Sequence, residues 1–181
     1  MVRSLAVLAG LVLLLPACSS GDGESAPAGG KPATVTVTSS AFHNGKPVPQ
    51  RYTCHGRGVS PPLAWSHVPS GAKELALVVD DPDAPKRRYV HWLVVGIDPS
   101  AKGVATGHTP AGGTVVANSG GDRKYLGPCP PAGTGVHHYR FTVYAFDEPL
   151  RLGAGAKADD AVAEIDEKAS DWGRLTGTYR G

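Results

Sequence analysis

Glycine and proline divide this chain into short segments. The 181 residues include 24 glycines and 16 prolines, which gather in the stretches 59–72, 81–87, 98–113 and 117–135. Proline lacks a backbone donor and glycine readily adopts left-handed turns, so both residues interrupt regular structure. We therefore expect these stretches to be loops with fixed turns, and every regular element has to fit between them.

The segments between these loops have the patterns of β-strands. Residues 34–38 alternate Thr and Val, which is typical of a half-buried strand. Residues 74–80 and 91–97 are short apolar runs bounded by turn residues, so we expect central strands buried on both faces. A final short strand is expected at 175–179. Residues 138–146 alternate, which places one set of side chains on a single face: Tyr139, Phe141, Val143 and Ala145.

One segment has a clear helical period. From Ala158 to about Trp172, apolar residues recur at the spacing of one helical face. Asp159 or Asp160 is expected to cap its start, and Gly173 to end it. Many strands followed by one late helix predict a mostly β sheet or sandwich with a peripheral C-terminal helix.

The N-terminus is predicted to be a targeting signal outside the fold. Arg3 precedes an apolar run from Leu5 to Leu15, which is short for a membrane span and typical of a signal peptide. Ala17-Cys18 resembles a bacterial lipobox, so we expect a signal peptide at 1–17 and a diacylated Cys18. Two acyl chains suffice to hold a protein at the extracytoplasmic face of the cell membrane. The alternative is an ordinary secretory signal that leaves Cys18 free.

Composition then sets the domain organisation. Residues 18–33 are mostly Ser, Gly, Ala and Pro, which predicts a disordered tether before a single domain at 34–181. The formal charge of +2 falls to about +1 once Arg3 is removed. Because nucleic-acid binding usually needs a basic stripe, this charge argues against a nucleic-acid partner.

Two cysteines remain when Cys18 is lipidated. Cys54 and Cys129 would then lie in a compartment where disulfides persist, and we expect them to form one. The alternative is two buried free thiols. The chain has no CxxC spacing that would indicate zinc.

The chemically richest residues lie in two segments that we expect to meet in one pocket. The first runs from Asp81 through Asp83 to His91, and the second is 127–139. His137 and Tyr139 share a strand face, whereas His138 points to the other. Asp81 or Asp83 either orients an imidazole or makes a local Asx turn, and a lone histidine such as His91 is more often a core residue.

Other functions remain open at this point. No close ligand spacing indicates a metal site, and no cofactor is expected. A weak phosphoester or ester hydrolase would use the acid–base groups His91, His137 and Asp81. A secreted protease inhibitor or interaction module would instead use the loops of 98–125.

In its ordered set of motifs, the chain resembles the phosphatidylethanolamine-binding protein family, in its bacterial Raf-kinase-inhibitor-like branch. The motifs are Tyr52-Thr53-Cys54-His55-Gly56, Val59-Ser60-Pro61-Pro62-Leu63-Ala64-Trp65, Leu77 to Pro85, Tyr89-Val90-His91-Trp92, Gly127-Pro128-Cys129-Pro130-Pro131, His137-His138-Tyr139 and Gly173 to Tyr179.

This resemblance implies a two-sheet β fold with an anion pocket at one end. We expect no enzymatic activity, because the sequence has no evident nucleophile and no metal-spaced ligands. In such a pocket His91 and His137 would donate to the anion, and Asp81 would orient an imidazole. Tyr139 and the backbone near Cys129 would line the site. The resemblance also implies a small anionic or phosphorylated ligand and a protein partner, but a protein anchored outside the cell has no access to a cytoplasmic kinase. The pocket set implied is Asp81, Asp83, His91, Cys129, Pro130, His137 and Tyr139.

Overall fold

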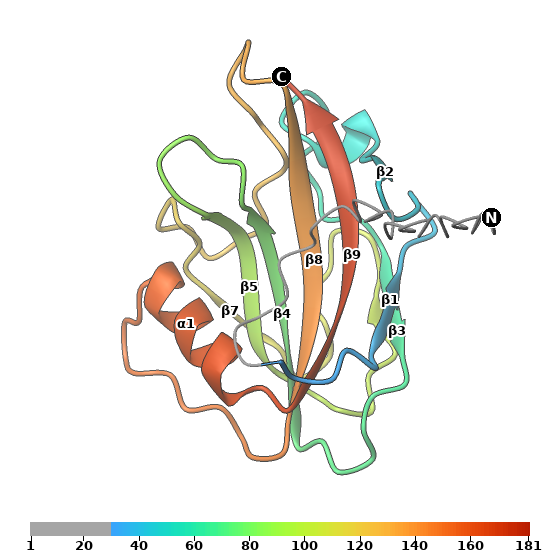
Figure 1. Cartoon of the computed structure of the whole chain (residues 1–181), viewed down its shortest axis with the longest axis vertical. Helices are drawn as coiled ribbons and strands as arrows, with labels where there is room; N and C mark the ends of the chain where they lie inside the picture. Colours follow the sequence, from blue (N-terminus) through green and yellow to red (C-terminus); the bar gives the residue numbers. More distant parts are fainter. Residues whose placement is uncertain (1–29) are drawn as a thin grey trace, which may run out of the picture.

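Two β-sheets carry the part of the chain that the computed structural model describes, residues 30–181 (Figure 1). The larger sheet has the order β2-β9-β8-β4-β5-β7, and the smaller has the order β1-β3-β6. The larger sheet consists of β2 (Lys46–Pro47), β4 (Glu74–Asp81), β5 (Tyr89–Ile97), β7 (Thr114–Val116), β8 (Val136–Phe146) and β9 (Asp171–Arg180). The smaller consists of β1 (Thr36–Thr38), β3 (Leu63–Ser66) and β6 (Gly103–Val104).

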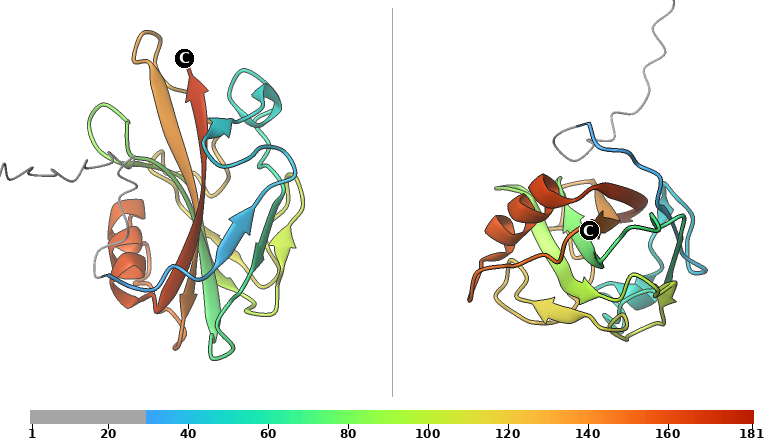
Figure 2. Two further views of the ribbon diagram at one scale, coloured as in Figure 1. Left: turned by 45° about the vertical axis from the view of Figure 1, so that its right-hand side comes forward. Right: turned by 90° about the horizontal axis from the view of Figure 1, so that it is seen from below.

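The larger sheet is buried on both faces, as the apolar runs predicted for its central strands. One face packs against the smaller sheet through the side chains of Leu75, Val79 and Phe141. The opposite face packs against α1 (Ala158–Lys168), so that the large sheet lies between the helix and the small sheet (Figure 2). Tyr139, Phe141, Val143 and Ala145 all lie in the core between the sheets, which confirms the predicted face of β8.

The helix ends earlier than its apolar period predicted. Ala169 has extended backbone angles (φ −58°, ψ 139°), and Trp172 lies on β9 opposite Tyr144. Sheet pairing therefore overrides the helical pattern after Lys168, and β9 starts at Asp171 instead of the predicted 175. Asp159 and Asp160 lie in the first helical turn but do not cap it, because the N-cap residue is Lys157.

Gly173 does not end the helix either; it allows a close approach. It pairs with Val143 in the middle of the sheet. A Cβ atom at this position would lie 1.7 Å from the carbonyl oxygen of Val35. Only glycine lets the chain at residue 35 cross the sheet this closely.

Two of the predicted loops contain short strands. The stretch 59–72 includes β3, whose Leu63 and Trp65 are buried while Ala64 and Ser66 are exposed. Flanking prolines hid this alternation in the sequence. The stretch 98–113 includes β6, and β7 is an unpredicted strand that pairs with β5.

Residues just before the predicted domain start at 34 already contact the fold. Lys31, which the sequence placed in the tether, donates from its ammonium to the carbonyl oxygens of Asp166 and Glu167 at the end of α1. The predicted signal peptide, Cys18 and the tether up to residue 29 lie outside the described residues. Between residues 30 and 181, none of the helices has the length and apolar character needed to span a membrane.

Candidate functional site

The predicted site residues come from three neighbouring strands and one loop. Asp81 ends β4, His91 lies near the start of β5, and His137 and Tyr139 lie near the start of β8. Alternation along β8 puts His137 and Tyr139 on the face turned to the small sheet. Because α1 packs on the opposite face, the helix does not cover these side chains.

Asp81 orients the imidazole of His137. The Nδ1 of His137 donates to Asp81 Oδ2 at 2.8 Å, and the two side chains are only 2% and 4% exposed. The other carboxylate oxygen accepts the backbone N–H of Asp83 at 2.8 Å. The two alternatives for Asp81, a local turn and an oriented imidazole, therefore occur together, one on each oxygen.

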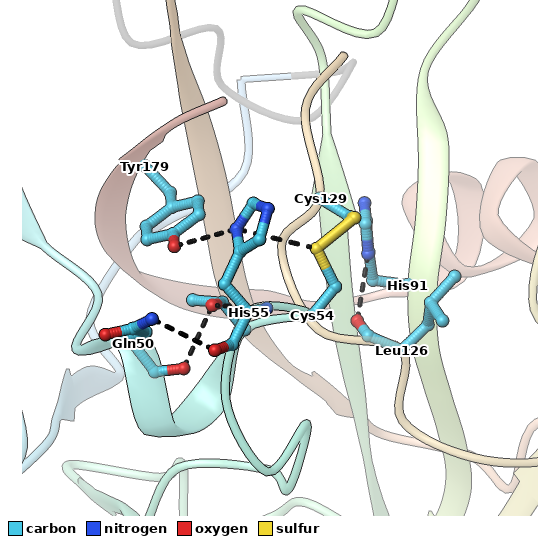
Figure 3. The surroundings of a disulfide bond; sticks show 8 residues. Gln50, Cys54, His55, His91, Leu126, Cys129 and Tyr179 are labelled. Carbon is cyan, nitrogen blue, oxygen red and sulfur yellow. Dashed lines mark hydrogen bonds between the residues drawn. A yellow bond between two sulfur atoms is a disulfide. The ribbon is translucent and has the colours of Figure 1, made fainter. Parts of the chain in front are cut away.

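His91 is held by the backbone of the loop that follows β7. Its Nδ1 lies 2.9 Å from the carbonyl oxygen of Leu126, and the N–H of Leu126 donates back to the His91 carbonyl (Figure 3). Burial lowers the pKa of His91, although the Leu126 carbonyl and the charge of Asp81 act in the other direction. The ring is therefore neutral at pH 7, with its hydrogen on Nδ1.

Tyr139 brings an unpaired hydroxyl into the middle of this group. Its side chain is fully buried and its ring packs edge-on against the His91 ring, with centroids 5.2 Å apart. The hydroxyl oxygen has no hydrogen-bond partner among residues 30–181. Burial raises the pKa of Tyr139 and the charge of Asp81 adds to this, while the backbone of Cys129 opposes it. The hydroxyl therefore keeps its proton and lies close to both groups.

A disulfide fixes the loop that carries the Cys129 backbone. The structure joins Cys54 and Cys129, as expected (Figure 3). The N–H of Cys54 donates to the carbonyl of Pro128 at 3.1 Å. A Cβ atom at Gly127 would lie 2.7 Å from the Tyr52 carbonyl oxygen, so glycine is needed for this loop to pack here. Pro130, the residue that follows Cys129, is buried.

The carboxylate of Asp83 pairs with His138 and makes no hydrogen bond to the other predicted side chains. Its carboxylate accepts hydrogen bonds from the backbone N–H and the Nδ1 of His138, both at 2.8 Å. Burial acts to raise the pKa of Asp83, but the hydrogen bonds from His138 outweigh it and hold the pKa below its usual value. Strand alternation turns His138 away from His137. Because the Asp83 carboxylate is hydrogen-bonded to His138, Asp83 lies on that exposed side.

Two groups were missed from the sequence. Thr134 places its hydroxyl oxygen 2.8 Å from the Nε2 of His137, on a loop whose Gly133 and Gly135 have positive φ angles of 82° and 89°. The Gly-Thr-Gly pattern was a signal for such a turn. The Leu126 carbonyl had no sequence signal, because backbone acceptors leave none. Among the described residues, no group of three acidic, His or Cys side chains is placed to hold a metal ion.

Comparisons with known proteins agree with the fold. Residues 38–180 match the family model described as phosphatidylethanolamine-binding protein. A Mycobacterium tuberculosis protein named "Putative lipoprotein LppC" is 48% identical over 186 residues, which cover 94% of this chain and 92% of that protein.

Solved structures show the same likeness. A phosphatidylethanolamine-binding protein homologue from Chlamydia trachomatis has a TM-score of 0.73 and 35% identity, covering 82% of this chain and 98% of its own. Escherichia coli YbcL, described as a member of the mammalian family, has a TM-score of 0.77 and 28% identity, covering 82% of this chain and 99% of its own.

Proposed function

Because the chain belongs to the phosphatidylethanolamine-binding protein family, we propose that it binds a small phosphorylated or otherwise anionic group between His91, His137 and Tyr139. The observation that carries this proposal is the Tyr139 hydroxyl, which is buried without a hydrogen-bond partner among the described residues. An unpaired buried polar group costs about 1–3 kcal/mol. A bound oxyanion would accept from this hydroxyl and remove that cost.

The surroundings of Tyr139 suit an anion. The backbone N–H of Cys129 is a second donor close to the Tyr139 hydroxyl. Asp81 is the nearby negative charge, but its two oxygens already accept from His137 and from the N–H of Asp83. Part of the charge of this carboxylate is therefore met by protein donors, which weakens its repulsion of an anionic guest.

We place this activity outside the cell membrane, with the protein held there by acyl chains on Cys18. The proposal rests on the lipobox-like Ala17-Cys18, on the Mycobacterium tuberculosis relative named as a lipoprotein, and on a disulfide, which persists outside the cytoplasm. A ligand-dependent contact with another extracytoplasmic protein is compatible with this location. The direct test of the anchor is mass spectrometry of the N-terminal peptide from membranes.

Ligand-induced stabilisation tests the binding proposal. Phosphoethanolamine or inorganic phosphate at a concentration 100 times the dissociation constant should raise the free energy of unfolding by about 2.7 kcal/mol. The gain should vanish in Tyr139→Phe, which keeps the ring. In the control Tyr125→Phe it should persist, because the Tyr125 hydroxyl already donates to the Tyr52 carbonyl at 3.0 Å. No gain in the wild-type protein at tens of millimolar would refute the site.

Hydrolysis is a second candidate, favoured by one observation. Asp81, His137 and the Thr134 hydroxyl form a chain of hydrogen bonds of 2.8 Å each, the order found in hydrolytic triads. However, Thr134 also lies 2.8 Å from the Pro131 carbonyl, to which it donates its only hydrogen. Turnover of phosphoesters or esters that is lost in Thr134→Val and in His137→Ala would establish an enzyme. If the wild-type protein shows no turnover, the binding proposal alone stands.

A further inference from the structure

His91 presents an acceptor, not a donor, to a guest in the proposed site. The Leu126 carbonyl, 2.9 Å from Nδ1, can only accept a hydrogen bond, so Nδ1 carries the hydrogen. In a neutral ring the other nitrogen, Nε2, then holds a lone pair. No residue of the described chain donates to Nε2, which Figure 3 shows on the side of the ring away from Leu126.

The groups around His91 favour this neutral form. Burial lowers its pKa, and the two aspartates that would favour the charged form are already engaged: Asp80 by Arg140 and Asp81 by His137. The groups around the ring are Tyr89 on β5, Asp81 on β4, His137 and Tyr139 on β8, and the Leu126 carbonyl. Asp80 lies on the other face of β4 and acts on His91 only through its charge.

The site therefore combines donors with an acceptor. Tyr139 and the Cys129 amide are donors for charged oxygens, whereas His91 Nε2 requires a hydrogen from the ligand. Resting on the anion site proposed above, we propose that the ligand is a singly protonated phosphomonoester, whose acidic hydroxyl donates to His91 Nε2. No fully deprotonated oxyanion satisfies all three groups.

This pairing couples binding to proton uptake. A phosphomonoester loses its second proton with a pKa of about 6, so most of it is a dianion at pH 7–8. The dianion has to take one proton from solvent to bind in this way. The association constant should therefore fall about tenfold for each pH unit between pH 6.5 and 8.5.

Calorimetry with phosphoethanolamine in buffers of different ionisation enthalpy measures this uptake. We expect about one proton bound per ligand at pH 8. An association constant that does not change between pH 6.5 and 8.5 would overturn the proposal while leaving the anion site intact. The absence of binding at every pH would instead refute the site itself, so the two failures are distinguishable.

Sulfate shows where the proton lies, because it has the shape of phosphate but carries no proton in this pH range. With His91 as an acceptor, sulfate leaves Nε2 unpaired. Sites built to hydrogen-bond a ligand group strongly reject analogues that lack it, so sulfate should bind at least about tenfold more weakly than inorganic phosphate at pH 6.5. Equal binding would mean that His91 is protonated and donates, which contradicts the proposal.

A variant locates the effect at His91. In His91→Gln the side-chain amide brings an N–H close to the position of Nε2, so the preference for phosphate over sulfate should be lost. His108→Gln is the matched control, since the exposed His108 also places Nδ1 2.9 Å from a backbone carbonyl, that of Thr106. A preference that survives in a folded His91→Gln variant would rule out His91 as the acceptor; should this variant not fold, the sulfate comparison on the wild-type protein still decides.

Discussion

At the scale of single residues, the buried Tyr139 hydroxyl costs the ligand-free protein stability. The group is buried and unpaired among residues 30–181, so Tyr139→Phe should stabilise the ligand-free protein by about 1 kcal/mol while it abolishes ligand-induced stabilisation. Urea denaturation with and without phosphate measures both. A variant less stable than the wild-type protein would show that the hydroxyl has a structural partner.

His91 should also make the stability of the protein depend on pH. Its pKa in the folded state is below the ordinary value of 6.5, so unfolding takes up a proton at pH values between the folded pKa and 6.5. The contribution of His91 is therefore complete above that pH and is lost as the pH falls toward the folded pKa. Denaturation at pH 7.5 and at pH 5.5 should show lower stability at pH 5.5, with a smaller loss in His91→Gln. An unchanged loss in that variant would assign the effect to other groups.

At the scale of elements, the loop 126–130 supplies both the Leu126 carbonyl and the Cys129 amide, and the disulfide holds it. The double variant Cys54→Ser and Cys129→Ser should lose about 4 kcal/mol of stability, because the bridge closes a loop of 75 positions. It should also weaken phosphate binding, since both backbone groups become mobile. Reduced wild-type protein provides the matched comparison. Binding that is unaffected by reduction would show that the loop is held without the bridge.

The sequence predicted the elements better than it predicted their ends. The central strands and the side chains of β8 follow from alternation, because pleating enforces a period of two. The helix boundary was wrong because Trp172 fits the helical period, whereas hydrogen bonds to β8 determine its actual conformation. Pairing partners far apart in the chain are not visible in a local pattern.

In the candidate site, too, the sequence predicted what depends on a local pattern and missed what depends on distant parts of the chain. The pairing of His137 with Tyr139, and the opposite direction of His138, follow from alternation alone. The role of Asp81 came from the family resemblance. The motif did not show that the Asp83 carboxylate pairs with His138, because it does not show which strand face follows the turn. Thr134 and the Leu126 carbonyl depend on how loops fold over the strands, which the sequence does not specify.

At the scale of the whole molecule, Asp80 and Asp81 connect opposite sides of the large sheet. Asp81 faces the small sheet and His137, whereas Asp80 faces the helix. Arg140 donates to both oxygens of Asp80 at 2.9 and 2.6 Å, and Arg88 donates to it at 2.7 Å. Arg88 also pairs with Asp166 on α1 at 3.2 Å. Asp80 therefore links β4, β8 and the segment before β5 to the helix.

Asp80→Asn should accordingly be among the most destabilising changes in this part of the chain. Asp80 is 3% exposed, and its loss leaves the largely buried Arg140 without its anionic partner, which costs about 3 kcal/mol when a buried pair is broken. Asp83→Asn, three positions later at the exposed rim, is the matched control and should stay within about 0.5 kcal/mol of the wild-type protein. Urea denaturation compares the two. Because Asp80 points away from the site, the folded Asp80→Asn variant should still gain stability from phosphate. Equal unfolding free energies for Asp80→Asn and Asp83→Asn would show that the network does not hold the helix to the sheet.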